Sequence, residues 1–301
     1  MIHIDQIVKT YNKGTVKALN GISLDISAGE IFGLIGPDGA GKSSLFRVLT
    51  TLLLPDSGTA SINNWDVVKD YKIIRNSIGY MPGRFSLYQD LTVEENLNLF
   101  ATVFGTTIKE NYHLIKDIYE QIEPFKDRRA GKLSGGMKQK LALCCALIHK
   151  PIALFLDEPT TGVDSVSRKE FWDMLKDLKK QGITIMVSTP YMDEVILCDR
   201  IALIQTGNII SIDTPQKIRD AFPLKLFAVK TPYTFKVMHE LRNYEHTLSC
   251  LAFGDSIHVA FDDPKAKESA IEFLNKKGIT DFSIEPVQPT IEDSFIQLLK
   301  N

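Results

Sequence analysis

Residues 36–44, GPDGAGKSS, combine small residues with one lysine and two serines, a set that suits phosphate binding. Residues 36–43 match the spacing GxxxxGK[ST], and they stand between the apolar stretch GEIFGLI and an amphipathic stretch. Glycines let successive backbone N–H groups point at phosphate oxygens, and the start of a helix adds partial positive charge. Lys42 would place a mobile charge on the outer phosphates, and Ser43 would offer a hydroxyl to Mg²⁺. The alternative is a glycine-rich turn that binds nothing. The predicted phosphate-binding residues are Gly36, Pro37, Asp38, Gly39, Ala40, Gly41, Lys42, Ser43 and Ser44.

Two adjacent carboxylates, Asp157 and Glu158, end the apolar stretch IALFL. A carboxylate at the end of a buried strand is costly unless it faces a cation, so Asp157 is predicted to hold the hydration shell of Mg²⁺. Glu158 is the candidate catalytic residue, because it could orient or deprotonate an attacking water. The alternative for this pair is a simple cap of the next helix. The predicted metal site therefore consists of Ser43 and Asp157.

A second candidate phosphate site lies in LSGGMKQK, residues 133–140. Ser134 is a natural N-cap, and Gly135 and Gly136 would let a phosphate approach the backbone at the start of the next helix. One chain thus carries two helix starts that can face phosphate.

Taken together, these motifs resemble those of the ATP-binding cassette (ABC) ATPases. GPDGAGKSS, LSGGMKQK, ALFLDEPTTGVD and STPYMDE occur in the order of that family and cover roughly residues 1–220. The resemblance implies that ATP and Mg²⁺ bind between the phosphate loop of one subunit and the LSGG signature of another. It also implies a D-loop at Asp164. The residues that it assigns to the partner's ATP are Leu133, Ser134, Gly135, Gly136 and Met137.

Other phosphate-loop classes fit the sequence poorly. A GTPase would need NKxD and DxxG motifs, but NKGT at residues 12–15 ends in threonine, and Asp157 leads to Thr160. A small-molecule kinase would lack the signature. The DNA-repair and chromosome ATPases insert a long coiled coil between the two nucleotide motifs, and the distance from Lys42 to Ser134 leaves no room for one.

Tyr11 matches the aromatic residue that stacks on adenine in the family, and a core or hairpin aromatic is the alternative. Stacking tolerates any base, so the preference for ATP over GTP rests on the resemblance.

Residues 81–97, MPGRFSLYQDLTVEENL, resemble the same region of the ATPases that serve type-2 drug and antibiotic exporters. There the stretch opens a helical subdomain that receives a cytoplasmic helix of the membrane partner. Phe85, Leu87 and Tyr88 would either line such a docking groove or form the local core of the subdomain. The tail PTIEDSFIQLL, residues 289–299, is also similar to the end of these exporter ATPases.

Two positions depart from the family pattern. Gly83 stands where the glutamine of the Q-loop is expected, and Pro190 stands where the switch histidine is expected. Neither side chain can contact Mg²⁺, water or the γ-phosphate. We therefore expect the site on this phosphate loop to bind ATP and hydrolyse it poorly, while the LSGG signature completes an active site on a different ATPase. The alternative is a homodimer that hydrolyses ATP slowly. GPDGAGK, with Asp38 where asparagine is commoner in the family, also resembles the first of the paired ATPase halves in some exporters, and this resemblance favours the asymmetric pair.

The elements that must position these motifs follow from the hydrophobic pattern. Isoleucine-rich stretches at 2–9 and 22–35 predict strands, and apolar residues at helical spacing predict a helix from Lys42 to Leu54. Buried strands that alternate with helices indicate an α/β fold with a parallel-core sheet. The other predicted strands are 152–156, 183–187 and 201–204, and the other predicted helices are 93–104, 108–121, 137–149 and 166–180. By resemblance, this is the phosphate-loop cassette fold, with an antiparallel β subdomain and a helical subdomain at about 84–135.

The pattern changes after residue 222 and divides the chain into an ATPase domain, 1–222, and a small α+β domain, 223–301. The second region predicts a strand at 224–230, a helix at 233–242, a hairpin at 247–261, a helix at 264–277 and a strand at 279–285. That order, βαββαβ, suggests a ferredoxin-like unit.

Composition limits the partners. The 35 lysines and arginines nearly balance the 37 aspartates and glutamates, so no basic field points to nucleic acid. The four cysteines have no metal spacing and suggest reduced core thiols. No leader or membrane span is recognisable, so we expect a peripheral protein at the cytoplasmic face of the membrane, bound to integral membrane permease subunits and to a second ABC ATPase domain. The predicted function is the ATPase subunit of an exporter; the alternative is a soluble regulatory ABC ATPase without a permease, such as a translation-linked factor.

Overall fold

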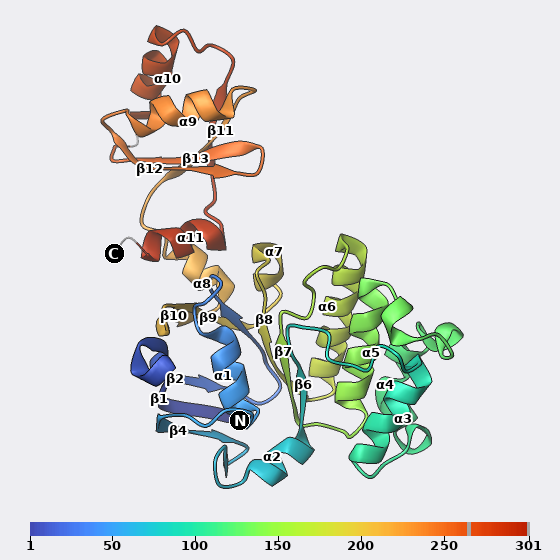
Figure 1. Ribbon diagram of the computed structural model, residues 1–301. Coiled ribbons are helices and arrows are strands. Elements are labelled where there is room, and N and C mark those ends of the chain that lie inside the picture. The colour runs from blue at the N-terminus through green and yellow to red at the C-terminus, as the bar shows by residue number, and fades with distance from the viewer. Residues whose placement is uncertain (264–265, 300–301) are drawn as a thin grey trace. The chain divides into compact units, whose positions relative to one another are not determined.

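A computed structural model describes residues 1–263 and 266–299 of the chain (Figure 1). Contacts between Cα atoms divide the chain into two compact units, Met1–Gln216 and Lys217–Asn301. This division falls slightly before the boundary expected at residue 222.

The first unit is built on a six-stranded sheet with the strand order β10-β9-β3-β8-β7-β6. The strands from β9 to β6 are parallel, and β10 pairs antiparallel with β9. Every residue of β3, β7 and β8 is buried, as their apolar composition predicts. The predicted fold class is confirmed. The strands are β3 (Ile31–Ile35), β6 (Ile78–Met81), β7 (Ala153–Asp157), β8 (Thr184–Ser188), β9 (Arg200–Gln205) and β10 (Asn208–Asp213).

A second, antiparallel sheet has the order β2-β1-β4-β5. It shares a hydrophobic core with β3 and α1, in which Ile4, Leu24 and Phe46 are buried together. Its strands are β1 (Ile2–Tyr11), β2 (Val16–Ile26), β4 (Ser57–Ile62) and β5 (Trp65–Asp66), and the short helix η1 (Asn12–Gly14) joins β1 to β2.

Helix α1 (Lys42–Leu49) follows β3 and is shorter than predicted. The expected helix to Leu54 is wrong, because the chain leaves the helical conformation after Thr50. The Thr50 hydroxyl donates to the carbonyl oxygen of Phe46, and Thr51 has a left-handed backbone with φ 62°. Leu52 and Leu54 are consequently exposed.

The helical region consists of α3 (Val93–Val103), α4 (Ile108–Tyr119) and α5 (Gly135–Leu147). Capping boxes begin the first two of these helices, with Thr92 paired to Glu95 and Thr107 paired to Glu110. The remaining elements of this unit include α6 (Ser165–Lys180) and the short helices α2 (Tyr71–Ser77), η2 (Glu123–Phe125), η3 (Ala130–Lys132) and α7 (Met192–Val195); α8 (Pro215–Asp220) follows at its end.

The second unit contains a four-stranded antiparallel sheet with the order β12-β13-β11-β14. Along the chain, α9 joins β11 to β12, but β13 lies between these two strands in the sheet. Likewise, α10 joins β13 to β14, and β11 lies between them. This is a split βαβ arrangement. The elements are β11 (Leu226–Lys230), α9 (Thr234–Arg242), β12 (Thr247–Phe253), β13 (Ser256–Phe261), α10 (Ala266–Lys276), β14 (Ser283–Val287) and α11 (Ile291–Leu298). Residues 264–265 of the helix predicted at 264–277 lie outside the described residues, as do residues 300–301.

Within this second unit, α9 and α10 lie on one side of the sheet and α11 on the other (Figure 1). A buried pair ties α11 to the sheet: Nδ1 of His258 lies 3.0 Å from both carboxylate oxygens of Asp293, and each residue is 4% exposed.

The four cysteines, Cys144, Cys145, Cys198 and Cys250, are free and buried, as the sequence predicts. Burial raises the pKa of each thiol, to about 11 for Cys250. These thiols are therefore protonated core groups. Among the described residues, none of the helices combines the length and the apolar character that crossing a bilayer would require.

Candidate nucleotide-binding site

The phosphate loop lies at the carboxyl end of β3, beside the carboxyl ends of β8 and β7 in the same parallel sheet. The loop leads from β3 directly into α1, whose first residue is Lys42. Gly41 has φ 109°, and a Cβ atom there would lie 2.2 Å from the carbonyl oxygen of Ala18. Only glycine fits this approach, which sets the backbone N–H groups at the start of α1.

The Lys42 side chain is 5% exposed and reaches back across the loop. Its Nζ donates to the carbonyl oxygens of Gly36 at 2.8 Å and Pro37 at 3.1 Å, and it lies 3.7 Å from Oε1 of Glu158. The ammonium group therefore lies where the phosphate loop and the end of β7 meet.

Asp157 is the last residue of β7, and its neighbour in the sheet, Ser188, is the last residue of β8. The Ser188 hydroxyl donates to Oδ1 of Asp157 at 2.7 Å, and its oxygen accepts a hydrogen bond from the Glu158 N–H at 3.0 Å. One buried serine thus orients both the Asp157 carboxylate and the Glu158 backbone.

Glu158 has a left-handed backbone, with φ 52°. Such a conformation costs a non-glycine residue about 1–3 kcal/mol and occurs preferentially at functional sites. Its N–H also donates to the Ser188 carbonyl oxygen at 3.1 Å, and the Thr161 hydroxyl lies 3.4 Å from its Oε2. The Glu158 backbone is thus held by hydrogen bonds, while its side chain is 25% exposed and its carboxylate is accessible to water.

The donor set suits Mg²⁺ bound together with phosphates. Ser43 and Asp157 offer a hydroxyl and a carboxylate, which are hard oxygen ligands of the kind that Mg²⁺ prefers. Among the described residues, no cluster of three or more histidine, cysteine, aspartate or glutamate side chains could form an all-protein metal cage. The residues present therefore fit a magnesium ion that takes its remaining ligands from substrate and water.

Tyr11 ends β1, and its hydroxyl lies 3.2 Å from Oγ of Ser44 in α1. The structure therefore brings Tyr11 to the helix that carries the phosphate loop. Stacking of its ring on adenine stays a prediction.

The signature segment begins α5, as predicted. Ser134 is the N-cap, and its side chain accepts a hydrogen bond from the Met137 N–H at 3.3 Å. Ser134 and Gly135 are exposed, whereas Leu133 and Gly136 are buried. The helix start that would face a partner's phosphates is therefore accessible. Asp164, in the D-loop, caps α6 in the same way, and its carboxylate accepts from the Ser167 N–H at 3.0 Å.

Of the two unusual positions, Gly83 lies beside Asp157 and Pro190 follows β8. A Cβ atom at Gly83 would lie 3.2 Å from the carbonyl oxygen of Asp157 and 3.8 Å from its Oδ2. Pro190 follows Thr189 directly after β8 and is exposed. The site thus lacks a side chain at a position that points toward the Asp157 carboxylate.

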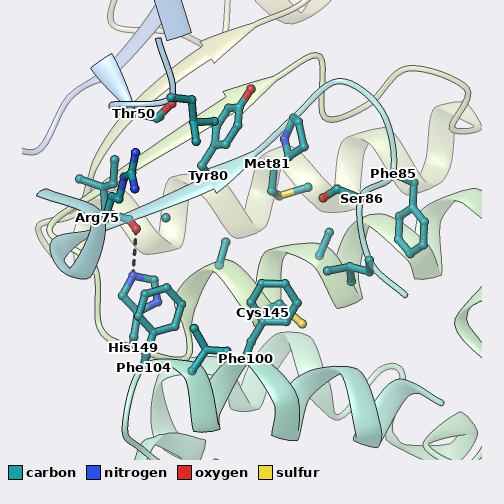
Figure 2. A pocket seen from close by; sticks show the side chains of 18 of the residues that line it. Thr50, Arg75, Tyr80, Met81, Phe85, Ser86, Phe100, Phe104, Cys145 and His149 are labelled. Atoms are coloured by element: carbon teal, nitrogen blue, oxygen red, sulfur yellow. Dashed lines mark hydrogen bonds between the residues drawn. The ribbon is translucent and has the colours of Figure 1, made fainter. Parts of the chain in front are cut away.

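A cavity of about 390 Å³ lies beside the site, between β6, α3 and α5 (Figure 2). Phe104 stacks on the imidazole of His149 with ring centroids 3.7 Å apart, and Nε2 of His149 donates to the carbonyl oxygen of Ile78. Burial lowers the pKa of His149, which favours the neutral ring. Labelled lining residues in Figure 2 are Thr50, Arg75, Tyr80, Met81, Phe85, Ser86, Phe100, Phe104, Cys145 and His149.

The structure separates the three apolar residues for which the sequence left two alternatives. Leu87 is buried, with 7% exposure, and both Leu87 and Phe85 line the cavity. Tyr88 is 59% exposed, and its backbone is held by the amide of Asn96. The loop therefore contributes to the local core, to the cavity wall and to the surface.

Two site residues were missed from the sequence. Ser188 orients Asp157 and Glu158, and Glu194, in α7, accepts the hydroxyl hydrogen of Thr160. Both belong to the stretch STPYMDE. For Ser188, the only signal in the sequence was its position at the end of a predicted buried strand.

The family described as "ABC transporter" matches residues 19–161. The "Probable multidrug ABC transporter ATP-binding protein YbhF" of Escherichia coli is 37% identical over 279 residues, covering 91% of this chain and 48% of that protein. The chain thus spans about half the length of this relative. The "Nod factor export ATP-binding protein I" of Rhizobium sp. is 38% identical over 289 residues, covering 95% of this chain and 93% of that protein.

A similar solved structure is the dimeric post-hydrolysis state of the ATP-binding cassette MJ0796 bound to ADP and Pi. It is 26% identical, with a TM-score of 0.65, covering 71% of this chain and 98% of that chain. The similarity therefore extends over nearly all of an ATP-binding cassette captured in a post-hydrolysis state.

Proposed function

The chain belongs to the family of ABC transporter ATPases, and on this premise we propose that it is the ATP-driven subunit of a membrane exporter that works with a separate permease. The observation that carries the proposal is the pairing, in one chain, of the phosphate loop at Lys42 with the capped, accessible helix start at Ser134. We infer that the two helix starts face different nucleotides, so that two cassettes enclose ATP between them. The name of YbhF supports a role in multidrug transport, and the name of the Nod factor export protein supports export.

The residues of the site divide the chemistry among them. Lys42 and the N–H groups at the start of α1 bind the outer phosphates, and Ser43 and Asp157 would hold the magnesium ion. That ion, when bound, neutralises charge on the transferred phosphoryl group. Glu158 orients the attacking water and accepts its proton. The partner's signature supplies N–H groups from the opposite side.

The site on this chain's phosphate loop is proposed to turn over slowly. Gly83 provides no side chain near Asp157, and Pro190 provides no donor or acceptor to the γ-phosphate. Contacts of this kind contribute roughly 10²-fold to 10⁴-fold to a rate. The groups that bind ATP are intact. A heterodimer with a fully equipped ATPase is therefore favoured over a homodimer.

The cavity beside β6 is proposed to receive a cytoplasmic segment of the permease at the inner face of the membrane. Its wall is largely apolar, with Phe85, Phe100 and Phe104, while Arg84 adds a cation at the rim. Leu52 and Val103 line it and are 58% and 70% exposed. An amphipathic helix with an apolar face and an acidic residue would match this wall.

The experiment that tests this function is purification of the native complex through a tag on this chain. We expect an integral membrane protein and a second cassette ATPase to co-purify, and MgATP to be hydrolysed by the complex. Co-sedimentation with ribosomes and no membrane partner would instead support the soluble regulatory alternative.

A further inference from the structure

Glu194 is a buried carboxylate with 3% exposure, and it contacts three separate segments of the first unit. Its Oε2 accepts the hydroxyl hydrogens of Thr160 at 2.9 Å and Thr189 at 2.5 Å. Its Oε1 lies 3.6 Å from Nη1 of Arg168, in α6. One side chain therefore connects the loop after β7, the loop after β8 and the helix after the D-loop.

The Thr160 end of this contact continues into a tight turn. Thr160 is fully buried, and its carbonyl oxygen accepts a hydrogen bond from the Val163 N–H at 3.2 Å. The backbone hydrogen bond between Thr160 and Val163 closes the turn formed by residues 160–163, and Glu194 holds the Thr160 end of that turn.

Of the two signature glycines of α5, Gly135 lies against this turn and Gly136 lies against the first turn of α6. A Cβ atom at Gly135 would lie 3.0 Å from the carbonyl oxygen of Gly162, and one at Gly136 would lie 2.7 Å from Oγ of Ser167. At these distances there is no room for a side chain between the start of α5 and the residues that it contacts. The contact between Gly162 and Gly135 therefore offers a direct route from the turn to the start of α5.

We propose that Glu194 is a positioning residue for ATP hydrolysis, which fixes turn 160–163 and through it the signature that faces a partner's nucleotide. The proposal rests on the proposed function, because it requires that the signature completes a nucleotide site on another cassette. Thr189 directly precedes Pro190, so the Glu194–Thr189 contact is present although the switch position itself carries a proline. We assign this contact to the neighbouring site.

The test uses the purified native complex with Glu194→Gln and, separately, Thr160→Val in this chain. Thr160→Val keeps the side-chain shape and removes one hydroxyl, so it tests the same contact without changing the buried carboxylate. We expect either variant to lower kcat of the complex at least about tenfold, because small misplacements of catalytic groups are costly. The affinity of this chain alone for MgATP should stay within about twofold, since Lys42, Ser43 and Asp157 are unchanged.

Asp193→Asn is the matched control. Asp193 is the neighbouring carboxylate and also contacts Arg168, but its side chain is 69% exposed and it contacts neither threonine. Turnover by this control should equal that of the unmodified complex. A loss equal to that of Glu194→Gln would overturn the proposal, and so would a parallel loss of MgATP binding by the isolated variant chain, which would indicate general damage.

A further variant, Ser134→Arg, tests the proposed function of the signature independently of the positioning role of Glu194. If Ser134→Arg abolishes turnover while Glu194→Gln and Thr160→Val do not lower it, the positioning role is wrong and the proposed function stands. If Ser134→Arg has no effect, the signature completes no working site, and both proposals fail together.

Discussion

Gly83 lies directly against Asp157: a Cβ atom at residue 83 would be 3.2 Å from the carbonyl oxygen of Asp157 and 3.8 Å from its Oδ2. A longer side chain starting from this position would reach the region around the carboxylate. The site therefore lacks a side chain at a position from which one could contact Asp157.

The first prediction follows from this relationship. The double substitution Gly83→Gln with Pro190→His should raise ATP turnover by this chain's own site at least about tenfold, because it returns two groups that can contact water and phosphate. Turnover is measured at saturating MgATP with the native complex, in which the partner ATPase carries a substitution of its own catalytic glutamate so that only this chain's site is read. Glu158→Gln in the same background is the control, and it should remove the gain. An unchanged rate in the double variant would show that these positions do not limit turnover.

Lys42→Ala should weaken MgATP binding at least about tenfold, because the substitution removes a charged donor from the phosphates. Lys42 also holds the loop through the carbonyl oxygens of Gly36 and Pro37. Binding is measured by titration calorimetry. Lys69→Ala, at an exposed position away from the loop, should bind MgATP like the unmodified chain. Equal affinity of both variants would contradict the assigned role of Lys42.

Phe85→Asp should reduce recovery of the permease with the tagged chain at least about tenfold, because a charge at an aromatic anchor removes apolar contact. MgATP binding by the variant should be unchanged. Phe235→Asp is the matched control, since Phe235 is 84% exposed and belongs to the second unit. Recovery is quantified by mass spectrometry of the purified complex. Full recovery with Phe85→Asp would exclude the cavity as the docking site.

The His258–Asp293 pair predicts an acid-sensitive contribution to the stability of the second unit. Burial raises the pKa of Asp293, but hydrogen bonds from His258 and Thr290 lower it more, so the net pKa lies below the usual 3.8. The folded state therefore binds the proton less well than the unfolded state. The contribution is complete above about pH 4 and is lost as the pH falls through the folded pKa.

Asp293→Asn should therefore lower the free energy of unfolding by about 1–3 kcal/mol at pH 7. The difference from the unmodified chain should shrink toward pH 3. Urea unfolding at both pH values measures this, with Asp255→Asn at an exposed hairpin position as the control. A difference that stays constant between pH 7 and pH 3 would show that the Asp293 charge does not stabilise the fold.

The sequence predicted the elements whose pattern is local. The phosphate loop, the strand that ends at Asp157 and the cap at Ser134 each depend on short-range spacing, and the structure has all three. The end of α1 was placed too late, because Leu52 continues the helical apolar spacing while the left-handed backbone at Thr51 breaks the helix.

Contacts between distant segments were not predictable from one sequence. Ser188 and Asp157 become neighbours only because β8 pairs with β7, and Glu194 meets Thr160 only when both strand ends are in place. Tyr88 and Leu87 have similar apolar character in sequence, and only the packing of the helical region exposes one and buries the other.

The central claim is that this chain's phosphate loop binds ATP while its signature serves a faster site on a partner. The most direct measurement compares ATPase activity of the native complex carrying Glu158→Gln in this chain with the complex carrying the equivalent change in the partner ATPase. We predict that Glu158→Gln here leaves most of the turnover, and that the partner's substitution abolishes it. Loss of turnover with Glu158→Gln alone, together with an unaffected rate after the partner's change, would contradict the account.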